Sequence, residues 1–313
     1  GSFHPDGSLT RAQFCKMAVY AMNQSSELGK YRTVTIFPDV KPAYWASAYI
    51  NLSAKGKQII SGYPDGKFYP ERTVTCGQAV SILVRLLGYT ADQVGGIFPD
   101  SYMAQASTIG LTDGLSLSAG AALTRGQAAR LFLNLLRCNM KDGTAYAASI
   151  ATVKDDVMLI SSAALAADGT NSAMEIGSGS TYSMAYKTSN GTLNGRKGML
   201  LLDKAGKVLT FVPSGVGSNV TVTVSIAAAN KLTDTTGRVY AMSSDLSTYY
   251  NDSETTWSSV FAWLTPGTTV TLYLDTTGGV KYVFAGSGSV ASTAVLVAST
   301  GSTAGFAALA GQS

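Results

Sequence analysis

The stretch "GKFYPERTVTCGQA" (residues 66–79) decides the fold of the first half of this chain, because the chain carries its pattern three times. It aligns without a gap to "GSFHPDGSLTRAQF" (1–14), sharing the Gly-x-Phe-x-Pro start, the threonine and the glutamine. The segment "ALTRGQAARLFLNLL" (122–136) repeats the Leu-Thr-Arg-x-Gln part of the first copy. Such a repeat indicates small units that need neighbours to bury an apolar stripe.

Each unit has a first half that precedes the quoted stretch. The segment "IFPDVKPAYWASAYINLSAKG" (36–56) is repeated more loosely by "IFPDSYMAQASTIGL" (97–111). Phe-Pro-Asp ends an extended stretch, and Asp39 is placed to cap a helix. The apolar side of that helix would carry Trp45, Tyr49, Ile50 and Leu52. The turn residues of "SGYPDGKFYP" (61–70) then reverse the chain.

The second half of each unit is predicted to be a capped helix. A threonine at each N-cap is followed three residues later by a glutamine, the pairing of a capping box. These pairs are Thr10 and Gln13, Thr75 and Gln78, and Thr124 and Gln127. Behind each cap the apolar residues recur at helical spacing. The unit is therefore helix, loop, capped helix.

Phe-Pro-Asp, Trp-Ala, Gly-Tyr-Pro-Asp-Gly followed by Phe-x-Pro, and Thr-Arg-Ala-Gln resemble the motifs of the S-layer homology family. The resemblance covers residues 1–140, with a partial first repeat (1–35), a second (36–90) and a third (97–140). It implies three units packed pseudo-symmetrically around a helical bundle. It also implies non-covalent binding of a secondary cell-wall polysaccharide, often bearing ketal-linked pyruvate, in grooves between units.

The resemblance also implies which residues touch the glycan. Carried over motif by motif, they are Arg11, Arg125, Asp39, Asp100, Trp45 and Gly62. An arginine just inside a helix N-terminus adds a bidentate guanidinium to free backbone N–H groups, which suits a carboxylate. Aromatic side chains can cover a sugar ring, and an aspartate can accept hydrogen bonds from sugar hydroxyls.

Structural interpretations of the same residues stay open. Trp45 would then be a core residue beneath a helix. Asp39 and Asp100 would be plain N-caps, and Gly62 would serve a backbone conformation with positive φ. For the two arginines binding is favoured, because a cation in the first helical turn opposes the helix dipole unless something offsets it.

The copies are unequal. Cys76 stands where the arginine of the second copy should be, and Met103 replaces the tryptophan in the third. The third loop, "LTDGLSLSAG" (111–120), lacks Gly-Tyr-Pro-Asp-Gly. We therefore expect unequal grooves, weakest where position 76 would contribute. Because Gly1 aligns with Gly66, the first repeat is expected to be truncated to its capped helix.

Composition points to an exported, β-rich protein of two domains. The 313 residues are 46% hydrophobic and only 13% charged, with 33 glycines. No apolar run is long enough to span a membrane, and no signal peptide pattern is present in this chain. Residues 1–140 hold 13 Lys and Arg against 8 Asp and Glu, a net of +5, whereas residues 141–313 hold 10 against 11. The first half therefore suits an anionic polymer better.

The three cysteines, Cys15, Cys76 and Cys138, have no metal or redox spacing. Buried free thiols are the favoured interpretation, although a disulfide between two of them stays open.

Residues 141–313 are predicted to be a β-rich module with duplicated hairpins and a small-residue tail from about residue 299. Period-two alternation replaces helical spacing. A turn of the form Asp-x-x-Gly-x-Val recurs at Asp203, Asp234 and Asp275, which suits short hairpin loops with a bulge. The fold class is thus α + β, a helical repeat bundle followed by an antiparallel barrel or sandwich.

The second half shows little catalytic chemistry. The only histidine is His4, so no Ser/His/Asp triad can form there. Asp155 and Asp156 are adjacent and would point to opposite faces of a strand, unlike a glycosidase pair. Asp252 and Glu254 could bind calcium, but their spacing fits a solvated loop better. The sequence predicts no metal site, no cofactor and no enzyme.

The leading hypothesis is a cell-surface anchoring protein, extracellular and bound to wall polysaccharide, whose β-module is displayed or structural. It involves neither nucleic acid nor membrane insertion. Two alternatives remain: self-association of the β-module in a surface lattice, and a wall-anchored enzyme acting on extracellular or wall glycans.

Overall fold

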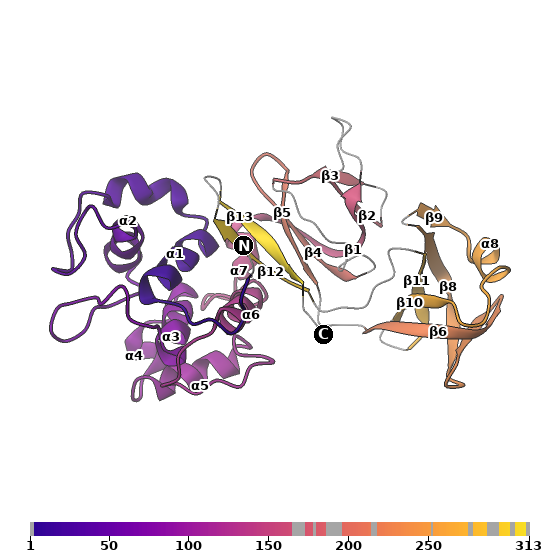
Figure 1. Ribbon diagram of the computed structural model, residues 1–313, viewed down its shortest axis with the longest axis horizontal. Helices are drawn as coiled ribbons and strands as arrows, with labels where there is room; N and C mark the ends of the chain where they lie inside the picture. The colour runs from indigo at the N-terminus through magenta and orange to yellow at the C-terminus, as the bar shows by residue number, and fades with distance from the viewer. Residues whose placement is uncertain are drawn as a thin grey trace. The chain divides into compact units, whose positions relative to one another are not determined.

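The computed structural model describes residues 3–164, 173–177, 180–185, 196–213, 218–251, 253–274, 278–286, 294–300 and 304–310. These residues fall into two compact units (Figure 1). The first comprises Gly1–Ile150 and Val297–Gly305, and the second comprises Ala151–Leu296 and Phe306–Ser313. Asp252 and Asp275, which the sequence singled out, lie outside the described residues.

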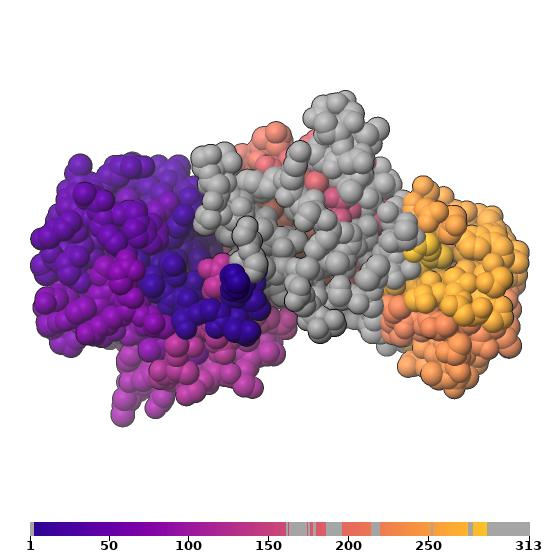
Figure 2. All heavy atoms as spheres, in the orientation of Figure 1, coloured from indigo at the N-terminus to yellow at the C-terminus, as the bar shows by residue number. Residues whose placement is uncertain are grey.

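Up to Ile150 the first unit is helical. Its elements are α1 (Arg11–Ala21), the 3₁₀ helix η1 (Ser25–Tyr31), α2 (Ser47–Asn51), the π-helical turn η2 (Leu52–Gly56), α3 (Cys76–Leu86), α4 (Ala91–Val94), α5 (Asp100–Thr108), α6 (Arg125–Leu135) and α7 (Tyr146–Ile150). In Figure 2 the described atoms of residues 3–150 run from indigo to magenta.

The predicted threonines are the N-cap residues of α1, α3 and α6. The hydroxyl of Thr10 accepts a hydrogen bond from the Gln13 amide (3.2 Å), and the Gln13 side chain accepts one from the Thr10 amide (3.0 Å). The same reciprocal pair forms at Thr75 and at Thr124. Each box satisfies two N–H groups that the helix itself leaves unpaired. The capping boxes expected from sequence are confirmed.

The three caps are also joined to one another by backbone pairing. Each cap threonine forms an isolated antiparallel bridge with the residue two positions before the cap of another copy. The bridges are Thr10 with Thr73, Thr75 with Ala122, and Thr124 with Ser8. The three copies are thereby linked in a closed ring at their helix N-termini.

The first helix of the second repeat begins later than predicted. Helix α2 starts at Ser47, and its N-cap residue, Ala46, makes no side-chain cap bond. The expectation that Asp39 caps this helix is wrong. A proline disfavours helical backbone in the residue before it, so Pro42 prevents a helix from running through Lys41.

The core of the first unit lies between the capped helices. Phe14 of α1 and Phe132 of α6 meet with ring centroids 5.4 Å apart, and both are buried. The cysteines are part of this core: all three are buried and free, as the favoured interpretation expected.

The second unit contains two sheets and one short helix. The strands are β1 (Thr152–Ala164), β2 (Ala173–Ile176), β3 (Thr181–Ser183), β4 (Lys197–Leu202), β5 (Val208–Pro213), β6 (Ser218–Ala228), β7 (Lys231–Asp234), β8 (Val239–Tyr250), β9 (Ser253–Thr255), β10 (Thr269–Leu274) and β11 (Val280–Ala285). The helix is α8 (Trp257–Phe261). Strands β12 (Ala294–Thr300) and β13 (Ala304–Ala310) form a separate two-stranded sheet where the sequence predicts a tail.

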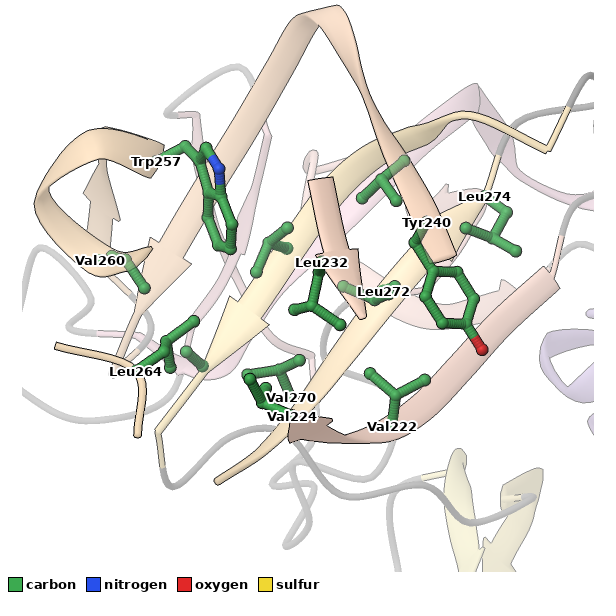
Figure 3. Packing of buried hydrophobic residues seen from close by; sticks show 13 residues of the cluster. Val222, Val224, Leu232, Tyr240, Trp257, Val260, Leu264, Val270, Leu272 and Leu274 are labelled. Carbon is green, nitrogen blue, oxygen red and sulfur yellow. The ribbon is translucent and has the colours of Figure 1, made fainter. Parts of the chain in front are cut away.

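One of the sheets closes on itself. Its strand order is β11-β10-β6-β7-β8-β9, and β11 also pairs with β8 in parallel. Figure 3 shows the apolar core inside this closed sheet, including Leu232, Val270 and Leu272. Trp257 of α8 covers one side and donates from Nε1 to the Ala228 carbonyl (2.9 Å). The sequence expectation of a small barrel is confirmed for this part, although the pair of strands that closes it is parallel and not antiparallel.

The other sheet has the order β3-β2-β1-β4-β5 and a core of its own. On its β1 strand, Met158 and Ile160 belong to one buried cluster with Tyr249, Tyr273 and Phe284. This aromatic cluster connects the two sheets of the second unit.

The predicted Asp-x-x-Gly turns form two of the hairpins. Asp203 Oδ1 accepts the amides of Ala205 and Lys207, both at 2.8 Å, between β4 and β5. Asp234 does the same between β7 and β8, where Gly237 has φ of +86°. Glycine adopts this left-handed conformation without the Cβ penalty, so the turn motif is explained.

Candidate functional site

A pocket of about 280 Å³ lies in the first unit, at the N-terminal end of α1. Four stretches of the sequence build it: the first turn of α1, the loop after η2, one face of α3, and Phe98 just before α5. The lining residues are Arg11, Ile59, Ile60, Ser61, Gly62, Tyr63, Pro64, Gln78, Ser81, Ile82, Arg85 and Phe98. Two of the sequence-predicted site residues, Arg11 and Gly62, therefore meet here.

Arg11 is almost fully buried, with 4% of its surface exposed. Its Nε donates to the Phe68 carbonyl (2.9 Å), and its Nη2 donates to the Ser61 carbonyl (3.3 Å). The guanidinium carbon lies 4.4 Å from the ring centroid of Phe68 and 4.9 Å from that of Tyr63. Burial lowers the pKa of Arg11, but an arginine stays charged at any physiological pH.

These contacts explain why a cation is tolerated in the first turn of α1. The helix dipole opposes it there, but two carbonyl oxygens and two aromatic faces offset the unfavourable field. Arg11 therefore joins the capped helix of one copy to the loop of the next and also forms a wall of the pocket.

Arg85 supplies a second guanidinium that the sequence analysis did not single out. Its Nη1 donates to Ser61 Oγ (3.2 Å) and its Nε to the Tyr102 hydroxyl (3.1 Å). One sequence signal was available: the equivalent positions of the other capped helices are uncharged, namely Tyr20 and Asn134. An arginine at an otherwise neutral repeat position marks the second copy as different.

The charge of the pocket is one-sided. None of its lining residues is Asp or Glu. Among the salt bridges between described residues, none involves Arg11 or Arg85. The remaining polar groups are neutral, and Gln78 Nε2 donates to the Tyr63 hydroxyl (2.9 Å). Such a pocket can bind a small anion that also offers hydroxyl groups.

Gly62 lines the pocket for a steric reason. It is not among the glycines with positive φ, so the expected backbone explanation is wrong. A Cβ at this position would lie 2.6 Å from Cε1 of Phe37 and 2.9 Å from the Lys67 carbonyl oxygen. The positive φ of this turn belongs to Gly66 instead.

The two aspartates lie outside the pocket lining. Asp39 accepts the backbone amides of Phe68 (2.9 Å) and Tyr69 (2.6 Å), so it fixes the loop that carries the Phe68 carbonyl. Asp100 is exposed and is the first residue of α5, after the N-cap residue Pro99. The N-cap interpretation is therefore wrong for both.

Trp45 lies on a different surface. Its exposed fraction is 51%, so its interpretation as a core residue is wrong. Its ring centroid is 5.7 Å from that of Tyr44 and 6.4 Å from that of Tyr49. The ammonium of Lys16 is 5.9 Å from the Trp45 centroid. These four residues form an aromatic patch that does not line the pocket.

Arg125 repeats the Arg11 contact in another copy. Its Nε donates to the Phe3 carbonyl (2.8 Å), and its guanidinium carbon lies 5.1 Å from the Phe3 ring centroid. At the equivalent position of α3, Cys76 is buried and offers no guanidinium. The junction at Cys76 therefore lacks the cation that the other two have.

Comparison with known proteins identifies the segment that carries the loop and the start of α3. Residues 36–80 match the S-layer homology domain. The chain therefore carries an S-layer homology domain. The matched segment includes Ser61, Gly62 and Gln78 of the pocket, whereas Arg11 and Arg85 lie outside it.

Proteins that this chain resembles over part of its length are surface proteins by name. A middle cell wall protein of Brevibacillus brevis is 31% identical over 48% of this chain and 14% of its own length. A surface layer protein of Brevibacillus choshinensis is 33% identical over 37% of this chain and 10% of its own length. A cellulosome-anchoring protein of Acetivibrio thermocellus is 27% identical over 28% of this chain and 19% of its own length. The chain spans less than a fifth of each relative.

The described residues contain no group of three or more His, Cys, Asp or Glu side chains that could hold a metal ion. No helix in the described part of the chain has the length and apolar character needed to cross a bilayer.

Proposed function

We propose that the first unit anchors this protein to the bacterial cell wall by binding a pyruvylated secondary cell-wall polysaccharide without covalent chemistry. The observation that carries the proposal is the pocket with two guanidiniums and no carboxylate in its lining. A ketal-linked pyruvate would place one carboxylate on a sugar ring, and a guanidinium binds a carboxylate through two parallel hydrogen bonds.

The size of the pocket supports a short ligand segment. Its volume of about 280 Å³ is close to the lower limit of ordinary ligand pockets, ~300 Å³. One substituted sugar at the end of a chain suits such a volume better than several consecutive rings. The hydroxyl of Tyr63 and the side chain of Gln78 provide neutral partners for sugar hydroxyls.

The three copies are proposed to form a pseudo-threefold bundle with unequal binding grooves. The ring of bridges between the caps supports this arrangement. So does the repetition of one contact, from Arg11 to Phe68 and from Arg125 to Phe3. Cys76 breaks the repetition, so the groove that depends on it would bind least.

The remaining sequence-predicted residues take supporting roles in this proposal. Asp39 would hold the pocket loop, and Trp45 would offer a second, neutral surface for sugar rings. The protein would act at the cell surface and without catalysis, with the β-rich second unit displayed or used in surface-layer assembly. The names of the relatives support this location.

The test is co-sedimentation of the full chain with purified cell walls. Walls treated with mild acid, which removes ketal-linked pyruvate, serve as the matched control. We expect binding to untreated walls and a loss of at least tenfold after treatment. Equal binding to both preparations would contradict the pyruvylated ligand, and no binding to either would contradict wall anchoring.

A further inference from the structure

We infer that Arg85 is the specificity-determining residue of this pocket, the guanidinium that pairs with the carboxylate of an acidic sugar, whereas Arg11 mainly holds the pocket together. The inference rests on the proposed function, because it concerns the ligand of the same site. It assigns the choice between acidic and neutral sugars to a residue outside the matched domain segment.

The two arginines differ in what their guanidiniums already contact. Arg11 is buried, and both of its hydrogen bonds end on backbone carbonyls. Those carbonyls cannot turn away without moving the loop. Arg85 is half-buried, and both of its hydrogen bonds end on side-chain hydroxyls, those of Ser61 and Tyr102. A hydroxyl can rotate to another partner when a ligand arrives.

The hydrogen bonds of Arg85 are also long. The Nη1 to Ser61 Oγ distance is 3.2 Å, and the Nε to Tyr102 hydroxyl distance is 3.1 Å. Bonds between a guanidinium and a carboxylate are shorter, about 2.7–2.9 Å, and roughly twice as strong as neutral ones. A ligand carboxylate would therefore replace Ser61 Oγ as the acceptor from Arg85 and form a stronger hydrogen bond. The Ser61 carbonyl would meanwhile still accept the hydrogen bond from Arg11.

The fold stabilises the positive charge of Arg85 without pairing it with a carboxylate. It lies in the last turn of α3, where a cation is favoured by the helix dipole. Its guanidinium carbon is 5.3 Å from the Tyr102 ring centroid. Neither feature supplies a carboxylate that would pair with the guanidinium. The equivalent residues Tyr20 and Asn134 show that the capped helix forms without a cation there.

The test compares one ligand with and without its charge, using the full chain. The probes are a methyl hexopyranoside carrying a ketal-linked pyruvate as the free acid, and its methyl ester. Affinities come from isothermal titration calorimetry. The variants are Arg85→Gln and the matched control Arg130→Gln. Arg130 is an arginine of α6 that donates to the Asp113 carbonyl and does not line the pocket.

For the unsubstituted chain we expect the acid to bind about tenfold or more tightly than the ester, the discrimination of one charge-assisted contact. Arg85→Gln should reduce this ratio to about twofold or less while leaving the affinity for the ester within about twofold. Arg130→Gln should keep the full ratio. Arg85→Met, which retains the apolar stem, should reduce the acid-to-ester ratio to the same extent. This second variant excludes an effect that is specific to glutamine.

The outcomes separate the two proposals. An acid-to-ester ratio that survives both Arg85 substitutions would overturn the inference and leave wall anchoring intact. A ratio that disappears in Arg130→Gln as well would also overturn it, because the effect would then be general. If the unsubstituted chain binds neither probe and does not sediment with walls, the proposed function fails and the inference fails with it.

Discussion

Arg11 donates from Nε to the carbonyl oxygen of Phe68, 2.9 Å away, and so ties the first capped helix to the loop of the following copy. Arg125 makes the same bond to Phe3. The motif arginine is therefore a structural link between copies before it is a ligand contact. A substitution at this position tests both roles at once, and stability must be measured beside binding.

Replacing Arg11 by glutamine should destabilise the first unit by about 2–3 kcal/mol, because the buried carbonyl of Phe68 and the partly buried carbonyl of Ser61 lose a charged donor. Arg125→Gln should cost less, about 1 kcal/mol, since that guanidinium is only half-buried. Urea denaturation followed by circular dichroism measures both. Equal losses of stability in the two variants would show that burial of the arginine does not determine how much stability its removal costs.

Adding one methyl group at Gly62 should both destabilise the loop and narrow the pocket. Its Cβ would lie 2.6 Å from Phe37, so Gly62→Ala should cost about 1–3 kcal/mol through overpacking. The matched control is Gly120→Ala, whose Cβ would meet nothing within 4 Å and should cost within about 0.5 kcal/mol. A neutral Gly62→Ala would mean that the Phe37 ring moves aside freely.

Local patterns predicted more of this fold than long-range ones. The capping boxes of α1, α3 and α6 depend on residues three apart, and the Asp203 and Asp234 turns depend on a few consecutive residues. Those predictions could be made because the interacting groups are neighbours in sequence. Short strands such as β2 and β9 are not predictable in this way, since three or four residues carry too little alternation to be recognised.

The pocket shows where such reasoning stops. Arg85 meets Ser61 and Tyr102 across 24 and 17 residues of sequence, a juxtaposition that only the packing of α3 creates. Of the two interpretations of Trp45, glycan contact and core residue, the second rested on the prevalence of large aromatics in cores. The delayed start of α2, after Pro42, leaves it on the surface instead. The candidate motif residues therefore do not gather at one site.

The stability of the barrel should fall in acid through Asp234. The hydrogen bond from the Thr236 side chain lowers the pKa of this carboxyl, with further bonds from the Arg238 amide and Tyr240. A pKa lower in the folded than in the unfolded state, where it is about 3.9, stabilises the fold above that pH. The contribution is lost as pH falls through the folded value.

Asp234→Asn should remove that part of the acid dependence, and Thr236→Val should move the loss toward pH ~4. Denaturation curves between pH ~2.5 and ~7 in a Trp45→Phe background report on this unit, because the other tryptophans are Trp257 and Trp263. If the stability of Asp234→Asn falls in acid as much as that of the unsubstituted chain, Asp234 is not the group responsible.

The three thiols should react only when the first unit opens. Burial raises the pKa of Cys15 to about 12 and that of Cys138 to about 11, and it also raises the pKa of Cys76. The thiolate is the reactive form, so Ellman's reagent at pH ~8 should modify the native protein at least ~100-fold more slowly than the denatured one. Three thiols should titrate in denaturant, and fewer would reveal a disulfide.

Trp45 offers the cleanest separation of binding from folding. Because half of its surface is exposed, Trp45→Ala should cost less than about 1 kcal/mol, whereas Phe14→Ala in the core should cost about 3–5 kcal/mol. If the aromatic patch covers sugar rings of the wall polysaccharide, Trp45→Ala should also weaken co-sedimentation with cell walls by about tenfold. Tyr250→Ala, an exposed aromatic of the second unit, is the control and should bind walls normally. Full wall binding by Trp45→Ala at unchanged stability would remove the patch from the glycan site and leave the arginine pocket as the anchor.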